Sequence, residues 1–367
     1  MTQLNVQNRT TQEMVYEAVT EALDDSDMDM KDINAIVVST MDCNSNGERQ
    51  KLYPSVLCSM FKTKLPSIRV PAVCGGSGAS LWTSLRLDYN NILVIGVERL
   101  ASTTSAITTD NIMMAAERIY EQSEGMLFPA QNALVAQQYM LKYKATTDDF
   151  ALVSLKNHEN ALLNPKARFY KKKVTLEEIK ESPIIASPLR LFDCCPNVNA
   201  AAACIITKDK TDIKITGSSL YSDYLSAIER EDMTTFDATK LAANDVYKQA
   251  NINANEINFA EVHDAFTPLE LLNYEDLGFC KKGEGKNLIR DGTTKLDGKL
   301  PVNPCGGLKA KGHPISATGI AQIYEIIKQM RKEAGDRQLS RTKIALAQNI
   351  GGVGSTVAVH ILKRVGG

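Results

Sequence analysis

Hydrophobic and polar residues follow two alternating periodicities along this chain. A helical pattern over residues 11–23 leads through an acidic turn into an apolar run at residues 33–38. Much later, a polar helical stretch over residues 238–250 leads into a second apolar run at residues 257–262. Repeated passage from a 3.6-residue period to a short apolar run is typical of strands alternating with helices. The pattern therefore predicts an α/β architecture.

The two passages also resemble each other in sequence. The first reads Lys-Asp-Ile-Asn-Ala-Ile-Val from residue 31, and the second reads Asn-Glu-Ile-Asn-Phe-Ala-Glu-Val from residue 255. Each is followed by a glycine-rich turn and then by a further apolar run, at residues 92–97 and 344–347 respectively. This repetition predicts a duplicated structural unit.

A stretch without this pattern separates the two copies. It covers residues 111–192, where methionines are followed by a lysine triplet. We therefore expect an N-terminal half over residues 1–110, an inserted loop or cap domain over 111–192, and a C-terminal half over 193–367. The strand that completes the N-terminal half is expected near 200–209. The triplet is either a solvated face or a site for ligand phosphates; its members are Lys171, Lys172 and Lys173.

Composition limits the class of protein. The chain has 367 residues, 44% of them hydrophobic, and a formal net charge of −1, so it is long enough to bury a large core. The balanced charge argues against nucleic acid as a partner. No apolar run reaches the roughly 18 residues that a membrane helix needs, and the N-terminus lacks the apolar stretch of a secretory signal. We expect a cytoplasmic protein.

Cysteine usage argues against a metal site. None of the eight cysteines forms a C-x-x-C pair, the spacing by which structural zinc sites are usually recognised.

Cys74 stands out because it follows the apolar run 68–73 and precedes Gly75-Gly76-Ser77-Gly78-Ala79 and a helix-like stretch at 81–87. A thiol over a helix N-terminus is favoured as thiolate, and small neighbours leave room for an acyl group. The alternative is a buried cysteine that packs as a small hydrophobe.

A second glycine-rich turn, residues 306–319, carries His313 in a Gly-His-Pro sequence. A cysteine nucleophile needs a base, which is usually distant in sequence and close in the fold. The chain has only four histidines, so few candidates exist. We expect His158, in the inserted segment, and His360, in an alternating strand, to be structural.

These motifs resemble those of the thiolases, specifically the archaeal acetoacetyl-CoA thiolases that group with the sterol carrier protein type. The resemblance extends from about residue 10 to 365 and includes further ordered motifs. They are Asn157-His158-Glu159-Asn160-Ala161, Asp193-Cys194-Cys195-Pro196, His263-Asp264-Ala265-Phe266 and Asn349-Ile350-Gly351-Gly352-Val353-Gly354. The resemblance implies a five-layered α-β-α-β-α thiolase fold made of two related halves.

The same resemblance implies a chemistry. An acyl group passes from coenzyme A to Cys74, whose proton His313 takes, and two acetyl-CoA give acetoacetyl-CoA and free CoA. His313 and His263 would donate to the enolate oxygen, and backbone N–H groups at Cys74, Gly351 and Gly352 to the oxygen of the acyl-enzyme. Coenzyme A is then a substrate, and no cofactor or metal is expected.

Two departures from the family pattern matter. Most relatives carry a second cysteine, which is the acid and base at the α-carbon. It stands at one of two positions, and this chain has Asn349 at the first and Ala265 at the second. The chemistry still requires a base, and the candidates are Cys305, His263 and an ordered water held by Asn349. Relatives also open with a strand, for which this chain offers only residues 3–6, so that strand is expected to be abbreviated or absent.

The resemblance extends to partners and leaves alternatives open. It implies a homodimer or tetramer acting in the mevalonate route to isoprenoids, in a complex with hydroxymethylglutaryl-CoA synthase and an OB-fold, zinc-ribbon companion protein. One alternative is a 3-ketoacyl-CoA thiolase or an aldolase acting on another acyl-CoA. Another is a non-catalytic scaffold, which the missing second cysteine supports and the pairing of Cys74 with His313 opposes.

Overall fold

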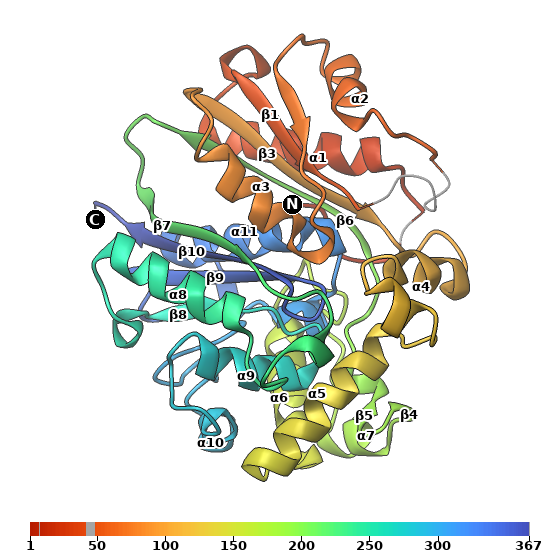
Figure 1. The fold of residues 1–367 in the computed structure, drawn as a ribbon. Coiled ribbons are helices and arrows are strands. Elements are labelled where there is room, and N and C mark those ends of the chain that lie inside the picture. Colours follow the sequence, from red (N-terminus) through yellow and green to blue (C-terminus); the bar gives the residue numbers. More distant parts are fainter. Residues whose placement is uncertain (7, 42–47, 367) are drawn as a thin grey trace.

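The computed structural model describes residues 1–6, 8–41 and 48–366, so Cys43 lies outside the described residues (Figure 1). The strands are β1 Ala35–Ser39, β2 Ser67–Arg69, β3 Asn91–Arg99, β4 Ile184–Ala186, β5 Leu189–Arg190, β6 Asn199–Thr207, β7 Ile213–Ser222, β8 Phe259–Glu261, β9 Ile344–Gly351 and β10 Thr356–Arg364. The helices are α1 Thr11–Ser26, α2 Tyr53–Met60, α3 Gly76–Ser84, α4 Ser105–Met113, α5 Phe128–Tyr143, α6 Thr147–Leu162, α7 Leu176–Glu181, α8 Asp237–Ala250, α9 Thr267–Asp276, α10 Gly285–Arg290 and α11 Thr318–Arg331.

Two sheets have the same topology. The first has the order β2-β1-β3-β6, in which β1 pairs in parallel with both β2 and β3, and β6 pairs antiparallel with β3. The second has the order β7-β10-β9-β8, in which β8 is parallel to β9 and β10 antiparallel to it. Isolated bridges extend both sheets, Val302 beside Ala260 of β8 and Asn5 beside Asn199 of β6. The duplication expected from the sequence is thus a repeated strand order.

The first strand of the N-terminal copy is reduced, as the sequence indicates. Its counterpart in the second sheet, β7, has ten residues, nine of which pair antiparallel with β10. At the N-terminus, the Asn5–Asn199 bridge and the hydrogen bond from the Thr2 N–H to the Ala201 carbonyl (2.9 Å) provide the corresponding pairing.

The elements form five layers (Figure 1). Helices α1 and α2 pack on the outer face of the first sheet, α3 and α11 lie between the two sheets, and α8 covers the outer face of the second. All five residues of β1 are buried, which is why this strand reads as a continuous apolar run rather than an alternating one.

The repeated sequence has a repeated local cause. Asp27 caps the C-terminus of α1 and Asn251 that of α8, both in the left-handed conformation that Asn and Asp tolerate best among residues other than glycine. Each is followed by a 3₁₀ turn, at Met30–Asp32 and Ala254–Glu256, and then by β1 or β8. The same cap and turn therefore lead each outer helix into its strand.

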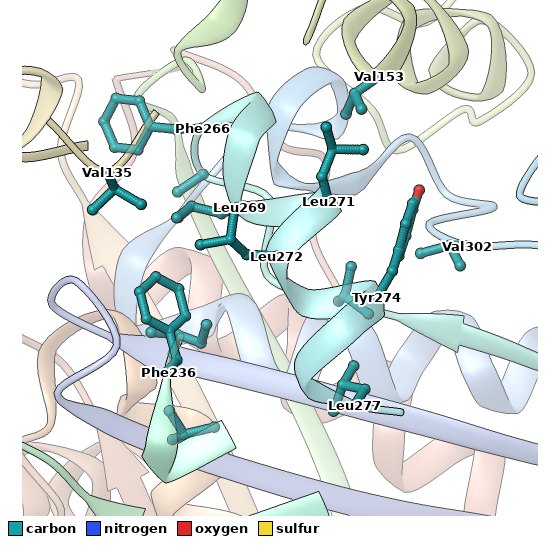
Figure 2. Packing of buried hydrophobic residues seen from close by; sticks show 14 of the residues in the cluster. Val135, Val153, Phe236, Phe266, Leu269, Leu271, Leu272, Tyr274, Leu277 and Val302 are labelled. Carbon is teal, nitrogen blue, oxygen red and sulfur yellow. The ribbon is translucent and has the colours of Figure 1, made fainter. Parts of the chain in front are cut away.

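The inserted segment shares a hydrophobic core with the second half. Figure 2 shows Val135 of α5 and Val153 of α6 around Leu269, Leu271 and other apolar side chains of α9. Because these side chains are almost fully buried together, the segment holds α9 and the loops beside it in place. In the part of the chain that the structure describes, no helix combines the length and apolar character needed to cross a membrane.

Candidate active site

A cavity of about 180 Å³ lies where the two halves and the inserted segment meet. It is lined by Cys74 from the first half, His263 and His313 from the second, and Met113 and Asn132 from the inserted segment. Residues separated by more than two hundred positions thus converge on one cavity. This is the usual setting for a small-molecule site.

Cys74 lies in the 3₁₀ turn Val73–Gly75, which leads directly into α3. The helix therefore begins at Gly76, earlier than the sequence suggested. Val73 has a φ of +48°, a conformation that costs a β-branched residue about 1–3 kcal/mol. Ser316, at the start of the other central helix, donates from its Oγ to the Val73 carbonyl (3.3 Å) and helps to hold this turn.

The glycines after Cys74 bring elements together. A Cβ on Gly319 of α11 would lie 2.6 Å from the backbone nitrogen of Gly78 of α3, and a Cβ on Gly78 would lie 2.9 Å from the Asn349 side chain. Both contacts are closer than real Cβ atoms tolerate. These small residues let α3, α11 and β9 approach one another, and the sequence interpretation that they make room for an acyl group was wrong.

The environment of Cys74 favours the neutral thiol. Burial raises the pKa of Cys74 to about 12, and the nearby carboxylate of Glu98 adds to the increase. Backbone N–H groups of Cys74 and Gly352 act in the opposite direction but do not offset it. The thiolate predicted from the helix N-terminus is thus not the resting state, and the thiol needs a base when it reacts.

His313 is suited to be that base. Its Nδ1 lies 2.7 Å from the Thr318 hydroxyl, while its buried Nε2 has no hydrogen-bond partner among the described residues. Burial, followed by the charge of Lys311, lowers the pKa of His313 to about 3, so the free ring is neutral. With the proton on Nδ1 directed at Thr318, Nε2 is an acceptor available to the cavity.

His263 is poised as a donor. Its Nδ1 accepts a hydrogen bond from the Ile350 N–H (3.3 Å), and burial, with His313 adding to it, lowers its pKa well below the usual value. The neutral ring therefore carries its proton on Nε2. The His263 and His313 rings lie edge to face, with centroids 5.1 Å apart. One acceptor and one donor nitrogen thus share the cavity with the Cys74 thiol.

Asp264 anchors the glycine-rich turn that carries His313. Its carboxylate accepts hydrogen bonds from the N–H groups of Leu308 (2.7 Å) and Lys309 (3.2 Å) and from the Asn157 amide (2.7 Å). A Cβ on Gly307 would lie 2.2 Å from this carboxylate, so the turn needs glycine there. Asp264 therefore acts as a local cap for the turn.

The other predicted site residues lie elsewhere. Asn349 is buried, with its Oδ1 accepting from the Gly78 N–H (3.0 Å) and its Nδ2 donating to the Cys74 carbonyl (2.9 Å). Cys305 is fully buried outside the cavity lining and donates from Sγ to Glu261 Oε2 (2.8 Å). Neither residue lines the cavity, which argues against Cys305 and a water held by Asn349, two of the three candidates for the α-proton base.

Of the remaining predicted site residues, the two glycines lie at the cavity and the three lysines lie on the surface. Gly352 lines the cavity, and Gly351 lies behind it, packed against Gly75 so closely that a Cβ on Gly75 would be 3.0 Å from the Gly351 nitrogen. The lysine triplet is exposed and lies outside the lining; its members are Lys171, Lys172 and Lys173.

The other two histidines are structural, as expected. His158 is buried edge-on against Phe169 and Phe192, and His360 bonds Ser218 (3.0 Å) and the Gly78 carbonyl (3.2 Å). Among the described residues, no three His, Cys, Asp or Glu side chains cluster closely enough to hold a metal ion.

Sequence reasoning gave no role to two thiols that line the cavity. Cys194 and Cys195 both line the cavity, and both are free thiols. They belong to a motif that contributed to the resemblance, but an adjacent pair gave no indication of a role. Their position becomes visible only when the segment 194–197 is placed between the two histidine motifs, through the bridges of Cys194 with Phe266 and of Asn197 with His313.

Comparisons with known proteins agree with this arrangement. The profile of the thiolase N-terminal domain matches residues 2–208, and that of the thiolase C-terminal domain-like family matches residues 219–364. The acetyl-CoA acetyltransferase of Methanothermobacter thermautotrophicus is 38% identical, over 96% of this chain and 94% of the relative. Sterol carrier protein 2 of Bos taurus is 30% identical, over 99% of this chain and 70% of the relative.

Solved structures show the same fold. The Ltp2-ChsH2(DUF35) aldolase superposes with a TM-score of 0.83 at 26% identity, over 99% of this chain and 95% of that one. A monomeric SCP2-thiolase like protein from Mycobacterium smegmatis has a TM-score of 0.72 at 17% identity, over 100% of this chain and 77% of that one. At this identity the likeness shows the fold alone. The chain therefore belongs to the thiolase family, in the group that contains the archaeal acetyl-CoA acetyltransferases and the sterol carrier protein 2 thiolases, and it is an acyltransferase.

Proposed function

We propose that this protein is an acetoacetyl-CoA thiolase that catalyses the reversible condensation of two acetyl-CoA to acetoacetyl-CoA and CoA. One observation carries the proposal. The neutral thiol of Cys74, an unpartnered ring nitrogen of His313 and a ring N–H of His263 share one cavity. Acyl transfer through a thioester needs a nucleophile, a base for its proton and a donor for a developing oxyanion.

The residues divide these tasks. In the cleavage direction, the Cys74 proton passes to Nε2 of His313 as the sulfur attacks the ketone carbon of acetoacetyl-CoA. The carbon–carbon bond then breaks, the acetyl group stays on Cys74, and the electron pair moves to the thioester oxygen of the departing enolate. The Nε2–H of His263 stabilises that oxygen, a contribution typically of about 3–4 kcal/mol for one such donor. The Gly352 N–H, which already acts on the Cys74 sulfur, lies beside the acetyl oxygen.

The finer assignments rest on relatives. Acetyl-CoA acetyltransferases at 38% and 35% identity support acetyl-CoA as the acyl donor and product. We propose coenzyme A as substrate with no further cofactor, and a supply of acetoacetyl-CoA to the mevalonate route. Condensation is unfavourable, so a consuming enzyme such as hydroxymethylglutaryl-CoA synthase would draw the product off.

A companion protein and self-association are part of this proposal. The structurally similar aldolase is described as Ltp2-ChsH2(DUF35), which supports a companion protein for this chain. We propose that the companion is the OB-fold, zinc-ribbon protein that the resemblance implies. We propose a homodimer or tetramer within such a complex, in the cytoplasm. Co-expression with a DUF35 protein and the synthase, followed by size-exclusion chromatography with light scattering, tests it: a chain that elutes alone as a monomer contradicts the proposal.

The activity test follows CoA-dependent loss of acetoacetyl-CoA by its enolate absorbance. Wild-type protein should cleave it, and Cys74→Ala should not. Mass spectrometry of wild-type protein mixed with acetyl-CoA should show one acetyl group on the peptide containing Cys74. A wild-type chain that neither cleaves acetoacetyl-CoA nor becomes acetylated contradicts the proposal.

A second candidate is an aldolase acting on another acyl-CoA, favoured by the TM-score of 0.83 with the aldolase structure. Retro-aldol cleavage releases an aldehyde or ketone and needs no acyl-enzyme. The two functions therefore separate at Cys74: an aldolase should keep its carbon–carbon cleavage in Cys74→Ala, whereas the thiolase should lose it.

A further inference from the structure

One step of the proposed reaction still lacks a group. After the carbon–carbon bond breaks, the α-carbon of the enolate must receive a proton. His313 holds the proton of Cys74 and His263 donates to the enolate oxygen, while Cys305 lies outside the cavity. The titratable side chains that line the cavity and remain unassigned, among the described residues, are Cys194 and Cys195.

Cys195 is held between the two histidine motifs by backbone contacts. Its N–H donates to the carbonyl of Ala265 (2.9 Å), two residues after His263, and the carbonyl of the next residue, Pro196, accepts from the N–H of His313 (3.2 Å). These hydrogen bonds fix the segment along one wall of the cavity. His313, on the adjoining wall, has a buried Nε2 without a partner among the described residues, so this part of the cavity is built to receive a ligand.

The two neighbouring thiols differ in their partners. The Cys194 thiol donates to the carbonyl of Arg190 (3.5 Å), whereas no hydrogen bond engages the Cys195 sulfur within the described residues. Cys195 also lies near enough to Cys74 for the charge of one thiolate to affect the pKa of the other. The free thiol is therefore the one beside the nucleophile.

A buried cation accompanies Cys195. Lys309 is 1% exposed, and although burial lowers its pKa, its ammonium group is stabilised by the neighbouring Cys195, Cys194, Asp193 and Asp264. Burial raises the pKa of Cys195, and the Lys309 charge opposes part of that increase. The thiol is thus protonated at rest, and its thiolate has a counter-charge when it forms.

We propose that Cys195 is the catalytic acid and base at the α-carbon, with Lys309 as a positioning residue that stabilises its thiolate. This inference rests on the proposed thiolase function. In cleavage, the Cys195 S–H bond breaks and its proton joins the enolate carbon, which gives acetyl-CoA and the Cys195 thiolate. The thiol of incoming CoA returns a proton to Cys195 and attacks the acetyl group, and Cys74 leaves and recovers its proton from His313. Condensation runs the same steps in reverse.

The test compares wild-type protein with Cys195→Ala, Cys195→Ser, Cys194→Ala and the distant control Cys280→Ala. The Cys195 variants should lower kcat for acetoacetyl-CoA cleavage at least about 100-fold, the range of general acid–base catalysis. In D₂O, they should also lose exchange of the acetyl-CoA methyl protons, followed by NMR. Cys74 should still become acetylated on long incubation, because that step breaks no bond at the α-carbon. Cys280→Ala should match wild type.

The variants separate the roles of the two thiols and the lysine. Cleavage and methyl exchange within threefold of wild type in Cys195→Ala overturn the assignment, as does a loss confined to Cys194→Ala. Lys309→Met should lower kcat with little change in KM, and a KM effect alone overturns its positioning role. A wild-type chain that neither cleaves acetoacetyl-CoA nor acetylates Cys74 instead overturns the thiolase function itself, and the role of Cys195 with it.

Discussion

The two halves share a strand order but divide the chemistry between them. Each central helix is preceded by a 3₁₀ turn, Val73–Gly75 before α3 and Ile315–Ala317 before α11, and the first residue of each turn has a positive φ. The middle residues are Cys74, which lines the cavity, and Ser316, which is fully buried and donates to the carbonyl of Val73. One copy of the turn thus carries the nucleophile, and the other supports it.

A second pair of equivalent positions differs in the same way. Ala35 and Phe259 occupy equivalent places in the repeated sequence. Ala35 pairs with Ile92 of β3, and Phe259 pairs with Ala345 of β9. Four residues further along each strand, Gly96 of β3 therefore corresponds to Asn349 of β9. The Asn349 amide bonds the Cys74 carbonyl, while a Cβ on Gly96 would lie only 2.6 Å from the Ser316 carbonyl. The duplicated framework was therefore kept, and a few positions at the two helix starts diverged into a catalytic and a supporting set.

The largest effect is expected when the two turns are made alike. Cys74→Ser places serine in both, and its hydroxyl is far harder to deprotonate than a thiol in this buried turn. We expect cleavage of acetoacetyl-CoA to fall at least about 1,000-fold in kcat. Activity within tenfold of wild type, in the enolate absorbance assay, would show that the thiol is not the nucleophile. Ser316→Cys in a Cys74→Ala background should not restore activity, because that side chain is directed away from the cavity.

Two histidines of the second half should respond differently. His263→Ala removes the Nε2–H donor and should lower kcat by about 10²–10³. His360→Ala removes buried hydrogen bonds to Ser218 and Gly78 and should instead lower the free energy of unfolding by about 1–3 kcal/mol, with kcat within threefold of wild type. Steady-state kinetics and urea unfolding separate these effects, and similar kcat losses in both variants would contradict the assigned roles.

Asn349→Ala removes the side-chain amide, which the equivalent residue of the first half, Gly96, also lacks. The variant loses hydrogen bonds to Gly78 and Cys74, which should lower the free energy of unfolding by about 1–3 kcal/mol. It should also lower kcat modestly, by about tenfold, because the Cys74 turn is less well held. The exposed Asn90→Ala serves as control, with an expected change within about 0.5 kcal/mol. Equal stability of the two variants would show that the Asn349 amide is not holding α3.

The smallest effect concerns Glu98, which lies in β3 of the first half and pairs with Ala200 of β6. Burial raises the pKa of Glu98 to about 7 from an ordinary value of 4.5. A raised carboxyl pKa means that its contribution to stability is complete below pH 4.5 and is lost as the pH rises through about 7. Between pH 5 and pH 8, a window that follows from these two pKa values, the free energy of unfolding should therefore fall less in Glu98→Gln than in the wild-type protein.

The same variant tests the link to the nucleophile. Above pH 7, where Glu98 ionises, its charge raises the pKa of Cys74, so Glu98→Gln should speed alkylation of the Cys74 peptide by iodoacetamide. At pH 5 the two proteins should react alike. A rate difference that does not depend on pH would contradict the electrostatic explanation.

The sequence predicted those features that depend on local pattern. The α/β alternation and the duplicated unit could be inferred from periodicity. The meeting of Cys74, His263 and His313 in one cavity was implied only by the resemblance to the thiolases. The protonation state of Cys74 could not, because burial outweighs the helix terminus and depends on the packed structure. The position of Cys195 beside Ala265 likewise depends on a hydrogen bond between segments about 70 residues apart in sequence.

The close approach of α3 and α11 bears on how this protein unfolds. Gly78 and Gly319 meet without room for a methyl group, so each half completes the interior of the other. A fragment ending after β6 would expose the buried faces of α3 and the first sheet to water, and would aggregate rather than fold. Unfolding should then be one cooperative transition of both halves. A stabilising change in either half should slow alkylation of the fully buried Cys305, which becomes accessible through global opening.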